Sequence, residues 1–173
     1  KYKGTLTVTG KNASPMELQI EVDVLNRTLP APKDWAFHLD LWQNPYSVAR
    51  YYQVPLWSKE HFDAMRPIMK MLANAGQRAI TTSIMHKPWA GQTEDHFDSM
   101  ITRIKKIDGT WAYDYAVFDK WVEFMMNEIG IDDMISCYTM IPWALSFDYY
   151  DEATNRVQFL NTKPVTPLTQ TIV

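Results

Sequence analysis

The chain has 173 residues and a formal net charge of −3, which suffices for one hydrophobic core and leaves no basic surface for nucleic acid. No apolar run approaches the roughly 20 residues of a transmembrane helix, so we expect neither nucleic acid nor a membrane among its partners. The single cysteine, Cys137, excludes an internal disulfide and a cysteine-based metal cluster. Because it lies in an apolar run, we predict a buried and unreactive thiol.

Aromatic residues make up 13% of the chain, with seven tryptophans and nine tyrosines. Aromatic side chains ordinarily fill a core. Several of these, however, stand beside proline, glycine, asparagine or glutamine in predicted loops, where lining a ligand cleft is the leading explanation. They are Trp42, Tyr46, Trp57, Trp89 and Trp143.

The first 31 residues predict the end of an all-β domain. Residues 2–9 and 16–24 alternate apolar and polar side chains around a turn at 10–12, as two paired strands do. Since two strands are not stable alone in water, we expect residues 1–31 to be the C-terminal strands of a β-sandwich and a linker. The linker is the stiff, proline-containing stretch 29–32.

From residue 32 onward the pattern changes to alternating strands and helices. A strand is predicted over 35–42, and a long loop follows it. Ser58 can cap a helix that ends at Gly76 and kinks at Pro67. The apolar stripe of this helix is Phe62, Met65, Met69 and Leu72.

A second strand is predicted over 78–85, followed by a short helix around 95–106 and a turn at 108–109. Asp114 can cap another helix, which ends before Gly130. Its apolar face is Phe118, Trp121, Val122, Met125 and Ile129.

A third strand is predicted over 134–141, and a hairpin joins 147–150 to 156–160. The repeated order of strand, loop and helix indicates parallel strands with right-handed crossovers. The loops after the strands are long and aromatic, as at the C-terminal face of a (β/α)₈ barrel, where active sites lie. A full barrel takes about 250 residues. We therefore predict an α/β fold in which residues 32–173 form the N-terminal part of a TIM-type barrel, with about three βα units.

Six residues near the ends of the three strands are candidate substrate-binding side chains. A carboxylate can bind sugar hydroxyls, and an indole can stack on the C–H face of a sugar ring. Plain packing is the alternative for each tryptophan, His86 can instead cap a loop, and His38 can pair with Asp40 inside the barrel. The six candidates are Asp40, Trp42, His86, Trp89, Tyr138 and Trp143.

Four blocks of the sequence resemble glycoside hydrolase family 123. They are FHLDLWQNPYSVARYYQVPLWS, HKPWAGQT, KKIDGTWAYDYAVFDKWVEFM and SCYTMIPWALSFDYYDEATNRVQ, and the similarity runs from about residue 2 to about residue 164. The resemblance implies a β-sandwich followed by a (β/α)₈ catalytic barrel. It also implies an enzyme that removes terminal β-linked N-acetylgalactosamine.

The resemblance further implies substrate-assisted retaining catalysis, in which the substrate's own acetamide oxygen attacks C1. An adjacent Asp-Glu pair stabilises the acetamide and supplies the general acid. The family carries this pair at the end of the fourth barrel strand, which we expect beyond Val173. The pair Asp151-Glu152 falls instead in a polar turn between two aromatic strands, so we predict that it is structural and that this chain holds no catalytic residue.

The remaining expectations concern ligands, partners and location. The four histidines lack ligand spacing, and there is no phosphate loop or serine nucleophile elbow, so we predict no metal and no cofactor. The expected partners are a glycan substrate and the remainder of the chain's own barrel. The isolated chain should be inactive and should associate through the free edge of its third strand.

Two alternatives to this reading stay open. One is a non-catalytic carbohydrate-binding protein, which the aromatic loops also fit. The other is a barrel hydrolase that acts on another sugar. We expect the parent protein to be secreted or periplasmic, although this chain carries no signal segment.

Overall fold

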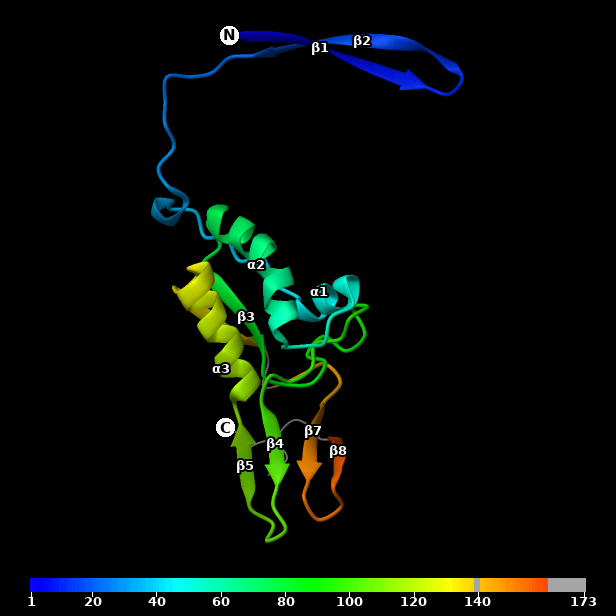
Figure 1. Cartoon of the computed structure of the whole chain (residues 1–173), viewed down its shortest axis with the longest axis vertical. Coiled ribbons are helices and arrows are strands. Elements are labelled where there is room, and N and C mark those ends of the chain that lie inside the picture. The colour runs from blue at the N-terminus through cyan, green and yellow to red at the C-terminus, as the bar shows by residue number, and fades with distance from the viewer. Residues whose placement is uncertain (139–140, 162–173) are drawn as a thin grey trace. The chain divides into compact units, whose positions relative to one another are not determined.

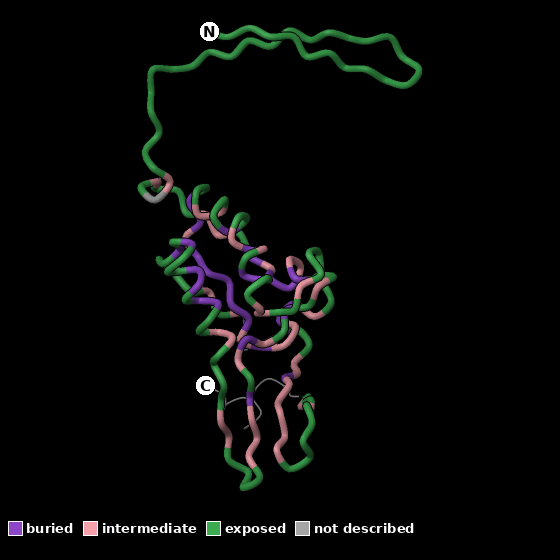
Figure 2. The backbone as a smooth tube through the Cα atoms, in the orientation of Figure 1, coloured by how far each residue is buried: buried purple, intermediate pink, exposed green. Residues whose placement is uncertain are grey.

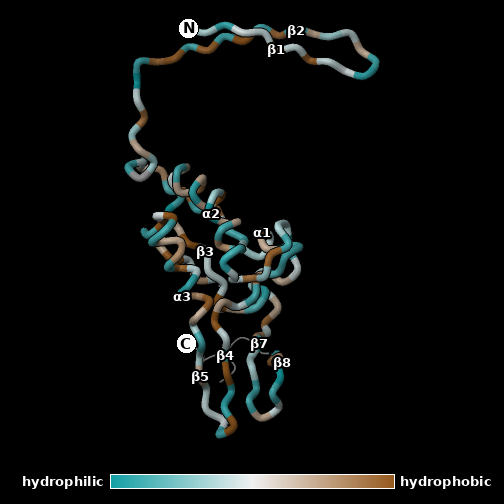
Figure 3. Tube along the Cα trace, viewed as in Figure 1, coloured by the Kyte–Doolittle hydropathy of each residue, from teal (hydrophilic) through white to brown (hydrophobic). Residues whose placement is uncertain are grey.

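Two antiparallel strands, β1 (Tyr2–Gly10) and β2 (Ala13–Val22), form the ribbon of the first unit, residues 1–31. The structure is a computed structural model that describes residues 1–138 and 141–161 (Figure 1). The register pairs Leu6 with Leu18 and Val8 with Met16. Because side chains alternate along a strand, these pairs share one face, and polar pairs occupy the other. All residues of both strands are exposed (Figure 2), and apolar and polar residues alternate along them (Figure 3).

The second unit, residues 32–173, contains the helix predicted from Ser58. The unit begins with a 3-10 turn, η1 (Pro32–Asp34). Helix α2 (Lys59–Asn74) is capped by the Ser58 hydroxyl, which accepts from the His61 N–H, and it continues through Pro67. Gly76 follows with φ +89°, a backbone conformation that favours glycine, and a Cβ there would also lie close to the Trp35 ring, at 3.2 Å. The predicted cap and end of this helix are confirmed.

A second amphipathic helix packs beside α2. Helix α3 (Ala116–Glu123) continues into a π-helical segment, η2 (Phe124–Ile129), which ends at Gly130 with φ +88°. Asp114 accepts from the Ala116 N–H, just before the helix. None of the helices in the described ranges is long and apolar enough to cross a membrane.

The main core lies between these helices and strand β3 (Ala79–Ser83), which is buried along its whole length (Figure 2). The fully buried Trp121 also donates its indole N–H to the Thr81 carbonyl at 3.0 Å, which ties α3 to the strand. The core residues are Phe62, Met65, Met69, Ile80, Met100, Trp121, Val122, Phe124, Met125, Ile129 and Ile131.

Strand β3 pairs in parallel with β6 (Met134–Tyr138), as predicted for consecutive strands of this type. Within the described part of the chain, β6 has no strand on its other edge. Cys137 on β6 is exposed, so the predicted buried thiol is wrong. The physical reason is that an apolar run on an edge strand is buried only where another segment covers it. Residues 139–140, the end of the predicted strand, lie outside the described residues.

A separate four-stranded sheet has the order β5-β4-β7-β8. Its strands are β4 (Thr102–Lys105), β5 (Trp111–Asp114), β7 (Ser146–Asp151) and β8 (Arg156–Asn161). Strands β4 and β7 pair in parallel, so the segments that follow β3 and β6 lie side by side (Figure 1). The predicted helix over 95–106 is therefore wrong. The predicted turn at Asp108-Gly109 closes a hairpin, and pairing on both edges of β4 outweighs local helix propensity.

The region 35–52 also differs from the prediction. In place of a strand over 35–42 there is an extended segment with one parallel bridge, Leu39 to Gln77. In place of the long loop there is helix α1 (Pro45–Tyr52). Asn44 caps this helix, because its side chain accepts from the N–H groups of Tyr46 and Ser47. Pro45 is the first residue of the helix, a position that proline favours.

Candidate functional site

Three aromatic side chains meet where segment 39–43, β3 and β6 end. The rings of Trp42 and Trp89 stack with centroids 4.9 Å apart and an interplanar angle of 24°. The Tyr138 ring lies 5.0 Å from Trp42 and 5.1 Å from Trp89. Trp42 is 54% exposed, whereas Trp89 is only 7% exposed. The cluster is therefore anchored on one side and open to solvent on the other.

The buried side of this cluster rests on further rings. The Phe97 ring lies 4.7 Å from Trp89 and 5.7 Å from Tyr46. The Tyr46 hydroxyl donates to the Asp98 carbonyl at 2.8 Å, and burial raises the pKa of this phenol. Trp57 packs edge-on to Tyr46 at 5.7 Å. Tyr46 and Trp57, two of the predicted loop aromatics, thus support the cluster from within.

A carboxylate with an unpaired oxygen accompanies these rings. Asp40 Oδ1 is buried and has no hydrogen-bond partner among the described residues. Burial raises the pKa of the Tyr138 phenol, the charge of Asp40 raises it further, and a hydrogen bond with Trp42 opposes both effects. His38 is exposed, so the suggested His38–Asp40 pair is wrong. A buried carboxylate oxygen without a partner is available to a ligand hydroxyl.

His86 and Trp143, the other two predicted site residues, make different contacts. His86 Nδ1 lies 3.0 Å from Asp98 Oδ1, and its ring lies 5.5 Å from that of Phe159 on β8. The backbone N–H of Trp143 donates to the Pro88 carbonyl, and Trp143 is 67% exposed. Thus Asp40, Trp42, Trp89 and Tyr138 are the four predicted residues that the structure brings together.

A buried arginine beside the end of β3 escaped the sequence analysis. The guanidinium of Arg103 donates to the Ile84 carbonyl and to Ser99 Oγ, and it lies 5.7 Å from the Phe147 ring centroid. Burial lowers the pKa of Arg103, and the charge of Asp148 opposes this shift. Arg103 therefore holds β4 and β7 against the end of β3. A single arginine in an alternating stretch gives no sequence signal for such burial.

The pair Asp151-Glu152 lies at the turn between β7 and β8. Glu152 forms an ion pair with Lys106 at 2.5 Å, and Asp151 Oδ1 accepts from the Ala153 N–H at 3.1 Å. Both carboxylates thus make contacts that organise the hairpin. Across residues 1–138 and 141–161, no group of three or more His, Cys, Asp and Glu side chains is arranged to hold a metal ion.

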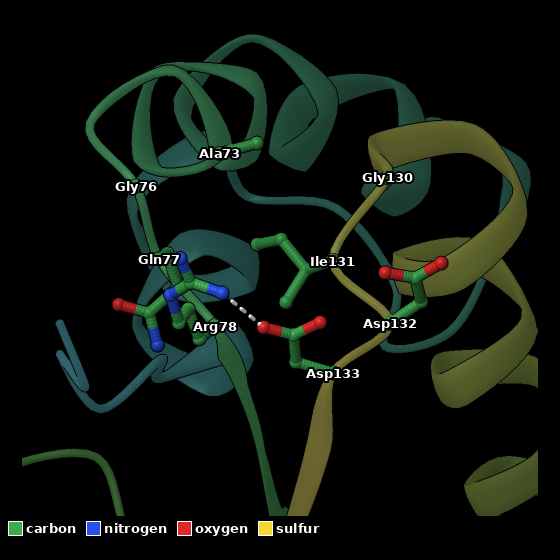
Figure 4. Close-up of a pocket in the computed structure, with 8 residues that line it drawn as sticks. All are labelled: Ala73, Gly76, Gln77, Arg78, Gly130, Ile131, Asp132 and Asp133. Atoms are coloured by element: carbon green, nitrogen blue, oxygen red, sulfur yellow. Dashed lines mark hydrogen bonds and ion pairs between the residues drawn. The ribbon is translucent and has the colours of Figure 1, made fainter. Parts of the chain in front are cut away.

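A hollow of about 80 Å³ lies at the opposite, N-terminal ends of β3 and β6 (Figure 4). Arg78 reaches across it to Asp133 at 2.6 Å and also donates to the Trp35 carbonyl at 2.7 Å. None of the six predicted site residues lines it. Its ion pair joins the start of β3 to the loop before β6, which is a structural role.

Comparison with known proteins identifies a family and a related solved structure. The family model described as glycoside hydrolase 123, catalytic domain, matches residues 42–172. The chain is also similar to a solved structure of a family 123 glycoside hydrolase from Clostridium perfringens, described for its hydrolysis of glycolipid glycans, with 32% identity and a TM-score of 0.81. The match covers 99% of this chain and 31% of that one, so the chain spans about a third of this relative. No curated protein matches.

Proposed function

Because the chain belongs to glycoside hydrolase family 123, we propose that it is part of an enzyme that removes terminal β-linked N-acetylgalactosamine from glycans. The observation that carries this proposal is the aromatic cluster beside an unpaired carboxylate. The exposed ring of Trp42, backed by Trp89 and Tyr138, offers an apolar surface for the C–H face of a sugar. Asp40 Oδ1 offers an acceptor for a sugar hydroxyl.

The proposed mechanism is substrate-assisted and retaining. The acetamide oxygen of the substrate forms a bond to C1 as the bond from C1 to the glycosidic oxygen breaks, and a glutamic acid protonates the leaving oxygen. Water then attacks C1, the bond between C1 and the acetamide oxygen breaks, and the same glutamate takes a proton from the water. We place the Asp-Glu pair beyond residue 173. The contacts of Glu152 with Lys106 and of Asp151 with Ala153 support a structural role for the pair in this chain.

We also propose that residues 32–173 are the start of a (β/α)₈ barrel and that residues 1–31 are the last strands of a β-sandwich. The parallel pairing of β3 with β6 and the parallel bridge from Leu39 to Gln77 support the barrel. The apolar face of the β1–β2 ribbon supports the sandwich, because such a face is stable only when a second sheet covers it.

The test is hydrolysis of an aryl N-acetyl-β-galactosaminide by this chain and by an Asp151→Asn, Glu152→Gln double variant. We expect no turnover by either protein, in samples that circular dichroism shows to be folded. Turnover that the double variant abolishes would make Asp151 and Glu152 the catalytic pair and would overturn the proposed placement. Addition of the remaining part of the barrel as a second polypeptide should restore turnover equally in both.

A further inference from the structure

We propose that Gln43 and Gln77 are positioning residues that hold Asp40 and Trp42 at the sugar site. This inference rests on the proposed function. Segment 39–43 runs beside β3 with one backbone bridge in place of a full ladder. Beyond that bridge, the side chains of Gln43 and Gln77 supply further hydrogen bonds between the segment and the strand.

Gln77 joins the segment to the start of β3. Gln77 is 5% exposed. Its Oε1 accepts from the Leu41 N–H at 2.8 Å, and its Nε2 donates to the Ala79 carbonyl at 2.7 Å. One amide thus bonds to the segment and to the strand at the same time.

Gln43 makes the complementary contacts. It is 2% exposed, and its Oε1 accepts from the Thr81 N–H at 2.8 Å. Its own N–H donates to the Thr81 hydroxyl at 3.2 Å. Its Nε2 donates to the Leu41 carbonyl and, at 3.3 Å, to that of Ala79.

Both backbone groups of Leu41 are therefore held by buried amides, its N–H by Gln77 and its carbonyl by Gln43. Asp40 and Trp42 are the neighbours of Leu41 on either side, so the same contacts fix the backbone that presents the carboxylate and the exposed indole. A side-chain amide can both donate and accept. A carboxylate of the same length can only accept, and a methionine of similar shape can do neither to a useful extent.

The stacked indoles of Trp42 and Trp89 provide a direct measure of this positioning. The electronic transitions of two stacked indoles couple, which gives a positive and a negative band side by side in far-ultraviolet circular dichroism. The loss of this paired band in Trp42→Phe identifies it as the signal of the stacked pair. We expect the band to disappear in Gln77→Met and in Gln43→Met and to weaken in Gln77→Glu. Gln19→Met, which changes an exposed glutamine on β2, is the matched control and should leave the band unchanged.

Binding of N-acetylgalactosamine, followed by calorimetry, is the second readout. We expect at least a tenfold loss of affinity in the two methionine variants and none in Gln19→Met. A retained band and unchanged affinity in both methionine variants would overturn the proposal. If Gln77→Met does not fold, Gln77→Glu replaces it in the test. The glutamate still accepts from the Leu41 N–H but cannot donate to the Ala79 carbonyl. If the unchanged chain binds no sugar, the proposed function fails, while the band still tests the positioning.

Discussion

The contact between Trp121 and β3 gives a stability prediction that can be worked out from the structure. Trp121 is fully buried and donates its indole N–H to the Thr81 carbonyl at 3.0 Å. In Trp121→Phe the lost buried hydrogen bond costs about 1–2 kcal/mol. The loss of two ring carbons from the core costs about 1.5 kcal/mol more. We therefore expect the free energy of unfolding to fall by about 2.5–3.5 kcal/mol.

Urea unfolding followed by circular dichroism measures this change. Trp143→Phe is the matched control, because Trp143 is largely exposed and the same substitution there should change the free energy by less than about 0.5 kcal/mol. Equal losses in the two variants would refute the reasoning that α3 stabilises β3 through this contact. A loss below about 1 kcal/mol in Trp121→Phe would do the same.

Three further predictions concern single side chains. Burial lowers the pKa of His61, whose Nδ1 accepts from the Trp57 N–H, so its unfolded form binds the proton more readily. The melting temperature should therefore fall as the pH drops below about 6.5, and less steeply in His61→Gln; equal slopes would contradict this. Glu152→Gln should cost less than about 1 kcal/mol in urea unfolding, since its pair with Lys106 is partly exposed. The exposed Cys137 should react with a thiol reagent before the chain unfolds, whereas reaction only in urea would show that it is covered.

Local signals in the sequence predicted most of the second unit. The cap at Ser58, the end at Gly76 and the apolar stripe of α2 each depend on residues a few positions apart, and all three are confirmed. The hairpin of β7 and β8 follows equally from alternation around a polar turn. Where a helix or hairpin is specified by its own residues, no knowledge of distant contacts is needed.

The errors fall where distant segments decide the structure. Strand β4 is stabilised by pairing with β5 and with β7, and β7 lies far along the sequence, after β5, α3 and β6. Segment 39–43 keeps the alternation of a strand, yet beyond one backbone bridge it is bonded to its neighbour largely through the side chains of Gln43 and Gln77. Periodicity predicts which face a residue occupies, but it does not identify what bonds to the backbone.

The candidate site was predicted in part for the same reason. Asp40, Trp42, Trp89 and Tyr138 meet because segment 39–43, β3 and β6 run in parallel and end at the same edge, an arrangement that the predicted order of elements implies. His86 belongs to the same end of the fold but pairs with Asp98 in the loop after β3. Arg103 is buried beside this region, and no pattern in the sequence marks it.

The most direct test of the proposed sugar site is a titration of tryptophan fluorescence with N-acetylgalactosamine, with mannose as the control sugar. We expect a saturable change with N-acetylgalactosamine that Trp42→Ala removes and that Asp40→Asn weakens at least tenfold. We expect a weaker change with mannose, whose equatorial O4 does not leave the continuous C–H face that the axial O4 of N-acetylgalactosamine leaves for stacking on Trp42. A signal that Trp42→Ala leaves intact, or no signal from a folded chain, would contradict the proposed sugar site at Trp42 and Asp40.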